Sequence, residues 1–270
     1  MSGPDLSITI PFYNEEGCCE QVLQKLTAAL EQHTIAYEIM AVDNGSTDRT
    51  GHILNRIAQS NPNVHIVKIA RNEGYGWGII SGLNACTGKY IGYIDGDTQI
   101  APDEVIRVYQ SVLTNQADIG KGKRVERFDG LQRKIISKIY NILFYIIFSC
   151  PIHDINAKPK ILRRTLYKQL GLKSKDWFID AELVLKAYAA GMRIDEVEIE
   201  FLKRQDGTSK VRMATIWEFI KNLWEGKITL WKTFWGITIV FLIIFGPIEF
   251  LVSEDNYPVR AFLYILYLII

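Results

Sequence analysis

The 270-residue chain shows no charge imbalance, no cysteine framework and no signal-peptide pattern in its first dozen residues. Lys and Arg number 31 against 30 Asp and Glu, so the net charge of +1 gives no reason to expect a nucleic-acid partner. The four cysteines show no paired metal-ligand spacing, and one adjacent pair is a poor disulfide framework, which favours buried thiols in a reducing compartment. No basic start followed by an apolar stretch occurs at the N-terminus, so we expect the catalytic part to be cytoplasmic.

Two common nucleotide-binding motifs are also absent. No G-x-x-x-x-G-K-[ST] segment occurs, which disfavours a P-loop enzyme. The glycine-rich segment 74–78 does not follow the first predicted strand, as a dinucleotide fingerprint would. A Rossmann oxidoreductase is therefore disfavoured as well.

Strand-like and helix-like segments alternate over the first 94 residues. Residues 6–11, 37–42, 64–69 and 90–94 are β-rich runs, and apolar side chains recur at helical spacing in 16–30, 47–59 and 76–85. This alternation predicts an α/β fold with a mostly parallel sheet and helices on both faces. Ligands of such sheets bind beyond the carboxyl ends of the strands, and polar segments follow each predicted strand here.

The segment DGDTQ ends the fourth predicted strand and contains the candidate metal ligands Asp95, Asp97 and Gln99. Two carboxylates and an amide are hard oxygen donors that suit Mg²⁺ or Mn²⁺, with substrate phosphate oxygens completing the coordination shell. Such an ion would neutralise a diphosphate leaving group. An isolated D-x-D is more often an ordinary acidic turn, so its context decides the interpretation.

Two further strand-end segments supply that context. Asp43 and Asn44 open a turn and helix N-cap after the second strand, and offer a carboxylate and an amide able to read a nucleotide base. The glycines of 74–78 would let a backbone approach a ligand closely and would open a helix toward phosphate.

Over residues 5–212 the chain resembles the family 2 glycosyltransferases with a GT-A fold, in particular the polyprenyl-phosphate sugar transferases of the dolichol-phosphate mannose synthase type. Five segments carry the resemblance in the right order: IPFYNEE (10–16), VDNGSTDRT (42–50), RNEGYGWG (71–78), DGDTQ (95–99) and RQDGTSK (204–210). The resemblance implies transfer of a sugar from a UDP- or GDP-linked donor to a polyprenyl phosphate, which can be dolichyl or undecaprenyl phosphate.

The resemblance also implies roles for individual residues. The nucleotide-sugar site would comprise Pro11, Tyr13, Glu15, Asp43, Asn44, Asp95, Arg204 and Lys210. Asp97, Asp154 and Arg204 would be catalytic, and Arg124, Arg133 and Ser137 would contact the acceptor phosphate. The chain departs from the family pattern at Asn44, where a second acid is frequent, and at residues 156–159, where relatives usually carry a glycine-aromatic pair.

The segment from Gly120 to Lys138 has seven basic residues against two acidic ones, which suits a phosphate near a membrane surface. A solvated charged face is the alternative interpretation. Residues 133–150 combine a basic stripe with apolar residues and predict a helix lying in the membrane interface, and residues 213–232 predict an amphipathic juxtamembrane helix.

Residues 234–252 form an apolar run with one charge, long enough to cross a bilayer as a helix. A second apolar run, from Ala261 to Ile270, is about half of the length that a span needs, so we expect a short or truncated helix there. Lysines before the first span place the large domain in the cytoplasm by the positive-inside rule. The expected organisation is a cytosolic domain at 1–212, the juxtamembrane helix at 213–232 and a single-pass or multi-pass anchor at 233–270.

An acceptor phosphate is largely ionised at neutral pH, so direct displacement with inversion at the anomeric carbon would need no strong base. Asp180 or Glu182 could supply a base if the acceptor were instead a hydroxyl of a saccharide or protein. Two alternatives therefore stay open: a membrane glycosyltransferase that acts on such a hydroxyl, and a scaffold that binds nucleotide sugar without turnover. The sequence is compatible with a homo-oligomer.

Overall fold

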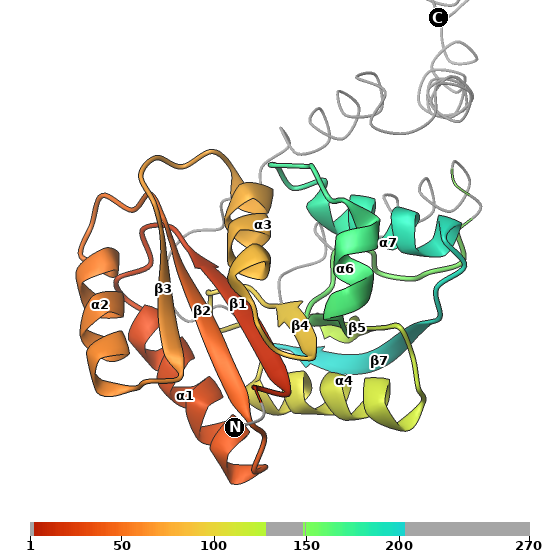
Figure 1. The fold of residues 1–270 in the computed structure, drawn as a ribbon, viewed down its shortest axis with the longest axis horizontal. Helices are drawn as coiled ribbons and strands as arrows, with labels where there is room; N and C mark the ends of the chain where they lie inside the picture. The colour runs from red at the N-terminus through yellow and green to blue at the C-terminus, as the bar shows by residue number, and fades with distance from the viewer. Residues whose placement is uncertain (1–2, 128–147, 149, 203–270) are drawn as a thin grey trace, which may run out of the picture. The chain divides into compact units, whose positions relative to one another are not determined.

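The computed structural model describes residues 3–127, 148 and 150–202 (Figure 1). The chain divides into two compact units, one of residues 1–137 and 152–212, the other of 138–151 and 213–270. Nearly all described residues belong to the first unit. The predictions for 213–232, 233–270 and most of 133–150 lie outside the described residues.

Seven strands and six helices build the described part of the first unit. The strands are β1 (Leu6–Phe12), β2 (Tyr37–Asn44), β3 (Val64–Ile69), β4 (Tyr90–Tyr93), β5 (Ile119–Arg127), β6 (Lys160–Arg163) and β7 (Ile194–Phe201). The helices are α1 (Cys19–Gln32), α2 (Thr50–Ser60), α3 (Tyr75–Ala85), α4 (Pro102–Thr114), α6 (Arg164–Leu170) and α7 (Ile179–Ala189). The four strands and three helices predicted up to residue 94 are confirmed.

The strands form one sheet in the order β3-β2-β1-β4-β6-β5-β7. Strands β1 to β4 are parallel to their neighbours within that group, and β5 is parallel to β7. Strand β6 runs antiparallel to both β4 and β5. The sheet is therefore mostly parallel, as predicted, with one reversed strand where its two halves meet.

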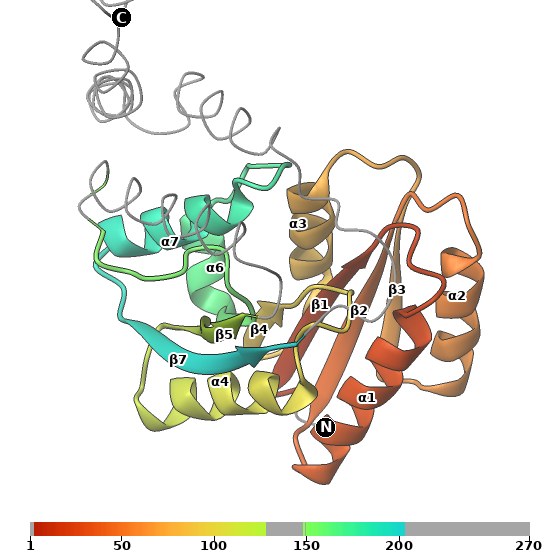
Figure 2. The ribbon, with the colours of Figure 1, turned by 180° about the vertical axis from the view of Figure 1, so that it is seen from behind.

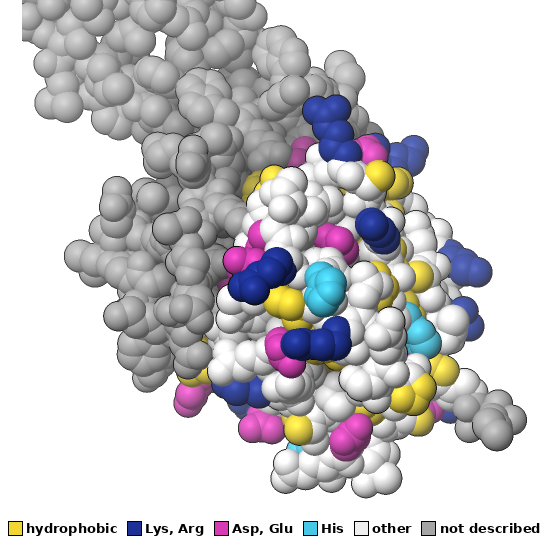
Figure 3. All heavy atoms as spheres, turned by 90° about the vertical axis from the view of Figure 1, so that its left-hand side faces the viewer, with side chains coloured by type: hydrophobic (Ala, Val, Ile, Leu, Met, Phe, Trp, Pro, Cys, Tyr) yellow, Lys and Arg dark blue, Asp and Glu magenta, His cyan; other side chains and the backbone are white. Residues whose placement is uncertain are grey.

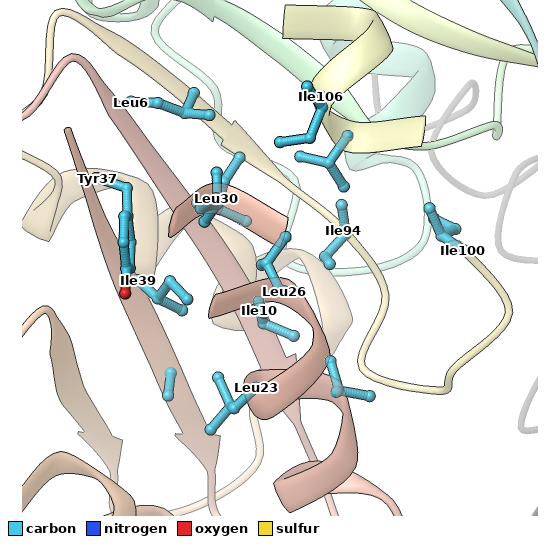
Figure 4. Packing of buried hydrophobic residues seen from close by; sticks show 14 of the residues in the cluster. Leu6, Ile10, Leu23, Leu26, Leu30, Tyr37, Ile39, Ile94, Ile100 and Ile106 are labelled. Atoms are coloured by element: carbon cyan, nitrogen blue, oxygen red, sulfur yellow. The ribbon is translucent and has the colours of Figure 1, made fainter. Parts of the chain in front are cut away.

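Helices cover both faces of the sheet, with α1, α2 and α4 on one side and α3, α6 and α7 on the other (Figures 1 and 2). Alternate residues of β1 sort between these faces. Leu6, Ile8 and Ile10 point into the main core, where they meet α1 residues such as Leu26, while Thr9 faces Gly82 of α3. Figure 4 shows this core, with side chains of α1 packed between the strands and α4. Burial of these aliphatic side chains fixes the register of the parallel strands.

Two helices begin later than their sequence patterns predict. Helix α1 begins at Cys19 instead of residue 16 because Asn14 takes a left-handed conformation (φ 52°) and residues 15–18 form a turn. Helix α2 begins at Thr50 instead of Thr47, since Asp48 accepts the Thr50 N–H at 2.9 Å in a turn of its own. Both shifts leave loops beyond the ends of β1 and β2.

Lys, Arg, Asp and Glu side chains are interspersed on the surface seen in Figure 3, which faces the β3 edge of the sheet. That face carries no large area of one charge sign. None of the helices in the described ranges is both long and apolar enough to cross a membrane, and the span predicted at 234–252 lies outside those ranges.

Candidate active site

The DGD segment leaves the sheet at the end of β4 and lies against the end of β1. A Cβ at Gly96 would come within 2.7 Å of the Phe12 ring and 3.0 Å of the Pro11 carbonyl oxygen, so only glycine fits there. The Cys18 thiol donates to the Gly96 carbonyl oxygen at 3.3 Å. The two carboxylates of the segment are therefore held beside the loop that follows β1, where the sequence predicts the nucleotide site.

Asp95 is contacted on both carboxylate oxygens. The Tyr75 hydroxyl at the start of α3 donates to Oδ1 at 2.5 Å, and the Lys158 ammonium lies 3.4 Å from Oδ2. Tyr75 stacks on Trp177 with ring centroids 4.2 Å apart. Burial, followed by the charge of Asp95, raises the pKa of Tyr75 well above its usual range, so this hydroxyl keeps its proton.

Asp180 at the start of α7 is the centre of a buried charged cluster. It lies 2.9 Å from the Lys158 ammonium, pairs with Lys160, and accepts a hydrogen bond from Tyr93 at 2.7 Å. Burial alone would raise the pKa of Asp180, but the two lysines more than offset this and lower it. Burial also lowers the pKa of Lys160 to about 7, although Asp180 opposes that shift. The Asp180 carboxylate is therefore already paired with two lysines and is a poor proton acceptor.

Arg124 and Asp154 form a second buried pair. Arg124 donates from Nε to Oδ2 at 2.8 Å and from Nη2 to Oδ1 at 2.5 Å, and its backbone N–H donates to Oδ2 at 3.0 Å. The guanidinium lies over the Phe201 ring, 5.0 Å from its centroid. Burial alone would raise the pKa of Asp154, but Arg124 and then Lys121 lower it to about 2. The structure thus joins a predicted catalytic acid to a predicted acceptor-phosphate residue.

Glu182, the other candidate base, is occupied as well. Its carboxylate accepts the N–H groups of Lys173 and Ser174 and pairs with Lys186 at 2.7 Å. Burial alone would raise its pKa, but these donors lower it. Glu182 therefore fixes the loop before α7.

In the predicted nucleotide-sugar site, Asp43 and Asn44 end β2 and are buried. Asp43 accepts the Ser46 N–H at 3.0 Å, and its other oxygen lies against Gly51 in the first turn of α2. Asn44 donates to the Gly74 carbonyl at 3.1 Å, and its Oδ1 has no hydrogen-bond partner among the described residues. Pro11 in β1 and Tyr13 and Glu15 in the loop after it are half-buried.

The interpretation of the glycines in 74–78 needs correction. A Cβ at Gly74 or Gly76 would overlap the carbonyl oxygens of Lys175 and Ser174, and the Trp77 N–H donates to the Lys175 carbonyl at 3.0 Å. These glycines admit the protein's own loop before α7, and one helix N–H group expected to face phosphate is already bonded. The close approach that the glycines indicate is real, but its partner is protein backbone.

The donor chemistry at the end of β4 fits a divalent cation. Within 3–127, 148 and 150–202, no three His, Cys, Asp or Glu side chains gather to hold an ion. Gln99 donates its Nε2 to the Leu202 carbonyl at 3.1 Å, which leaves Oε1 as the atom suited to a cation. The Lys158 ammonium beside Asp95 shows that this position already stabilises positive charge.

Residues 7–171 match the family model described as glycosyl transferase family 2. The chain belongs to this family. Membership of this family identifies the chain as a glycosyltransferase by family and disfavours the non-catalytic scaffold. The resemblance to family 2 is thereby confirmed. Four of the five segments that carry it lie within 7–171, and RQDGTSK (204–210) lies beyond the match.

Two relatives of this glycosyltransferase have informative names. The dodecaprenyl-phosphate galacturonate synthase of Rhizobium johnstonii is 28% identical over 227 residues, covering 81% of this chain and 65% of that protein. The undecaprenyl-phosphate 4-deoxy-4-formamido-L-arabinose transferase of Photorhabdus laumondii is 30% identical over 208 residues, covering 76% and 62%. The chain thus spans less than two thirds of the length of either relative.

Solved structures confirm a GT-A-like fold. Glucosyl-3-phosphoglycerate synthase from Mycobacterium tuberculosis, in complex with Mn²⁺, UDP and glucosyl-3-phosphoglycerate, superposes with a TM-score of 0.60 at 18% identity, over 76% of this chain and 74% of that one. The same enzyme with Mn²⁺, UDP-glucose and phosphoglyceric acid gives a TM-score of 0.61, also at 18% identity, over 76% and 73%. At this identity the likeness speaks to the fold alone.

The structure thus gathers two groups of predicted residues. One group lies at or just beyond the carboxyl ends of β1, β2 and β4: Pro11, Asp43, Asn44, Asp95, Asp97 and Gln99. The other is the pair of Arg124 on β5 and Asp154 in the segment before β6. Arg133, Ser137, Arg204 and Lys210 lie outside the described residues. Sequence reasoning missed Tyr75, Lys158, Lys160 and Trp177. An available signal was the segment KPKIL, in which Lys158 precedes β6 and Lys160 opens it, because lysines next to a short apolar segment are seldom buried without a partner.

Proposed function

We propose that this glycosyltransferase moves a sugar from a nucleoside diphosphate sugar to a polyprenyl phosphate, with inversion and with a bound Mg²⁺ or Mn²⁺. The names of the two relatives support a polyprenyl-phosphate acceptor, and the complexes of the structural neighbours support a UDP-linked donor with a divalent ion. The predicted interfacial helix at 133–150 and span at 234–252 would bring the enzyme to the membrane that holds this lipid.

One observation carries the choice of a phosphate acceptor: the candidate bases are already paired with cations or N–H donors. Asp154, Asp180 and Glu182 all have a lowered pKa, and each is held by at least one basic side chain. A hydroxyl acceptor needs a group that takes its proton, and these three carboxylates are poorly suited to do so. A phosphate monoester needs none, because its second pKa is near 6 and it is largely ionised at neutral pH.

In the proposed reaction, an acceptor phosphate oxygen attacks the anomeric carbon while the bond from that carbon to the diphosphate oxygen breaks. The nucleoside diphosphate leaves, and no proton needs to be removed from the nucleophile. Asp97, Asp95 and Gln99 would hold the metal, which supplies positive charge for the leaving diphosphate. Pro11, Tyr13, Glu15, Asp43 and Asn44 would bind the nucleoside, and Arg204 and Lys210 the diphosphate.

Asp154 acts in this proposal through Arg124. The bidentate pair fixes the guanidinium plane, and Arg124, with Arg133 and Ser137, would orient the acceptor phosphate. Asp154 is then a positioning residue and need not exchange a proton.

The test supplies the purified full chain with labelled UDP- and GDP-sugars, Mn²⁺ and polyprenyl phosphate, and extracts the product into organic solvent. We expect label in the organic phase that is lost with excess EDTA and with the variant Asp97→Asn. Label that appears only on a water-soluble saccharide or a protein would contradict the lipid acceptor. Such a result would favour the transferase that acts on a hydroxyl.

A further inference from the structure

Lys158 connects the motif that would bind the metal to the buried cluster on α7. Its side chain is 7% exposed, and its ammonium lies 3.4 Å from Asp95 Oδ2 and 2.9 Å from Asp180 Oδ2. The same ammonium lies 5.1 Å from the centroid of the Tyr75 ring, whose hydroxyl donates to the other oxygen of Asp95. Asp95 is therefore held by a cation on one side and a hydroxyl on the other.

The cluster contains a second lysine-tyrosine pair, for which the structure shows no hydrogen bond or ion pair to Asp95 among the described residues. Lys160 pairs with Asp180 and lies 5.6 Å from the centroid of the Tyr93 ring, and the Tyr93 hydroxyl donates to Asp180. Both lysines are buried and share the same carboxylate, but only Lys158 also contacts the metal-binding motif. The chain therefore offers a matched control for any role of Lys158 at Asp95.

We propose that Lys158 is a positioning residue that occupies Asp95 in the donor-free protein and weakens the affinity of the DGD motif for a divalent ion. The physical reason is competition: a unit positive charge at 3.4 Å from a carboxylate oxygen neutralises it and repels a second cation that approaches the same group. Asp180 holds the ammonium in place, because a buried lysine is stable only with a partner.

The consequence is that the affinity for the ion depends on the nucleotide, and this inference rests on the proposed use of a divalent ion. With Lys158 on Asp95, the motif alone is a poor metal site. A diphosphate brings its own oxygen ligands for the ion and negative charge for the ammonium, so the ion binds together with the nucleotide. By linkage, metal and nucleotide must then strengthen each other's binding by the same factor.

The experiment measures Mn²⁺ binding to the full chain by calorimetry, without nucleotide and then with saturating UDP or GDP. The variants are Lys158→Met and its control Lys160→Met, each of which leaves Asp180 with one lysine and the Tyr93 hydroxyl. For Mn²⁺ alone we expect Lys158→Met to bind at least about tenfold more tightly than the wild type and Lys160→Met to bind within about twofold. With nucleotide present, the gain from Lys158→Met should shrink to below about threefold.

Two results would overturn the proposal. One is a Lys158→Met protein that melts cooperatively and binds Mn²⁺ no more tightly than the wild type; the other is an equal gain in Lys160→Met, which would indicate total charge instead of the contact to Asp95. If Lys158→Met does not fold, Lys158→Gln gives the same comparison. The proposed function is tested by a different measurement. It fails if the protein binds Mn²⁺ and nucleotide but forms no lipid-linked product.

Discussion

The two halves of the sheet position their polar residues by different means. One half, built from β1 to β4, contains the proposed nucleotide site, and we call it the donor half. Its loops beyond the strands are held by backbone turns and short polar contacts, such as Asp43 with the Ser46 N–H and Asp48 with the Thr50 N–H. The other half, built from β5 to β7, contains the proposed acceptor site, and we call it the acceptor half. Its side chains are held by buried ion pairs, of which Arg124 with Asp154 and Lys158 with Asp180 are the main examples.

The difference matches the two tasks that the proposed reaction requires. A nucleotide can be bound by loops whose shape follows from turns and glycines. An acceptor phosphate and a leaving diphosphate need positive charge at fixed positions, and burial makes the carboxylate that fixes each charge costly to remove. The DGD segment lies where the halves meet, since β4 pairs with β1 on one side and β6 on the other.

The largest effect should come from that meeting point. Asp97→Asn removes a carboxylate that we propose to hold the metal for both halves, and we expect the rate of transfer to lipid to fall by at least about a thousandfold. The exposed Asp103→Asn at the start of α4 is the control and should keep the wild-type rate. If Asp97→Asn kept more than a tenth of the wild-type rate, Asp97 would not have the proposed role in binding the metal for transfer.

In the acceptor half, Asp154→Asn should reduce the free energy of unfolding by about 2–3 kcal/mol at pH 7, the equivalent of lowering the pKa from about 3.9 when unfolded to about 2 when folded. Because the folded pKa is the lower one, this contribution is full above about pH 5 and is lost as the pH falls from about 4 toward 2. Urea unfolding of both proteins at pH 7, 5 and 3.5 measures the difference. A difference that does not change with pH would mean that the ion pair is not its source.

In the donor half, Gly51→Ala tests whether loop geometry alone places Asp43. The added Cβ would overlap Asp43 Oδ2, so the carboxylate must move, and we expect nucleotide affinity to fall by about tenfold. Gly17→Ala is the matched control, because nothing lies within 4 Å of a Cβ there. Calorimetry with UDP and GDP measures the affinity of both variants. Equal nucleotide affinity would mean that the position of Asp43 does not affect nucleotide binding.

The smallest effect should come from an ion pair at the surface of the donor half. Arg56 contacts Glu20 at 2.6 Å, but its side chain is 59% exposed, so Arg56→Ala should change the free energy of unfolding by less than about 1 kcal/mol. The change should shrink further in 1 M salt, where exposed charges are screened. A decrease in the free energy of unfolding as large as that of Asp154→Asn would contradict the expectation that buried ion pairs stabilise the protein more than exposed ones.

Local patterns were enough to predict the donor half. Strand and helix periodicity located the elements up to residue 94, and turn chemistry after each strand located the polar loops. The starts of α1 and α2 were misplaced, because Asn14 and Asp48 form turns that consume the first predicted helical residues. The parallel arrangement followed from the alternation of strands with helices, which a chain can satisfy in few ways.

The acceptor half was not predictable in the same way. Lys158 and Lys160 were given no role from the sequence, yet both are buried, because α7 brings Asp180 to them, 20 residues beyond Lys160 along the chain. Arg124 and Asp154 were both singled out, but their pairing across 30 residues was not foreseen. Gly74 and Gly76 were expected to admit a ligand and instead admit the loop at 174–176.

The sequence by itself determined the family, the α/β alternation and the strand end at which Asp95 and Asp97 lie, because periodicity, turn residues and contiguous motifs are local properties of a chain. Only the tertiary structure decided which charges neutralise one another. Lys158 rests between Asp95 and Asp180, and Arg124 rests on Asp154, because packing removes these groups from water and leaves each with the partner that the fold brings within reach.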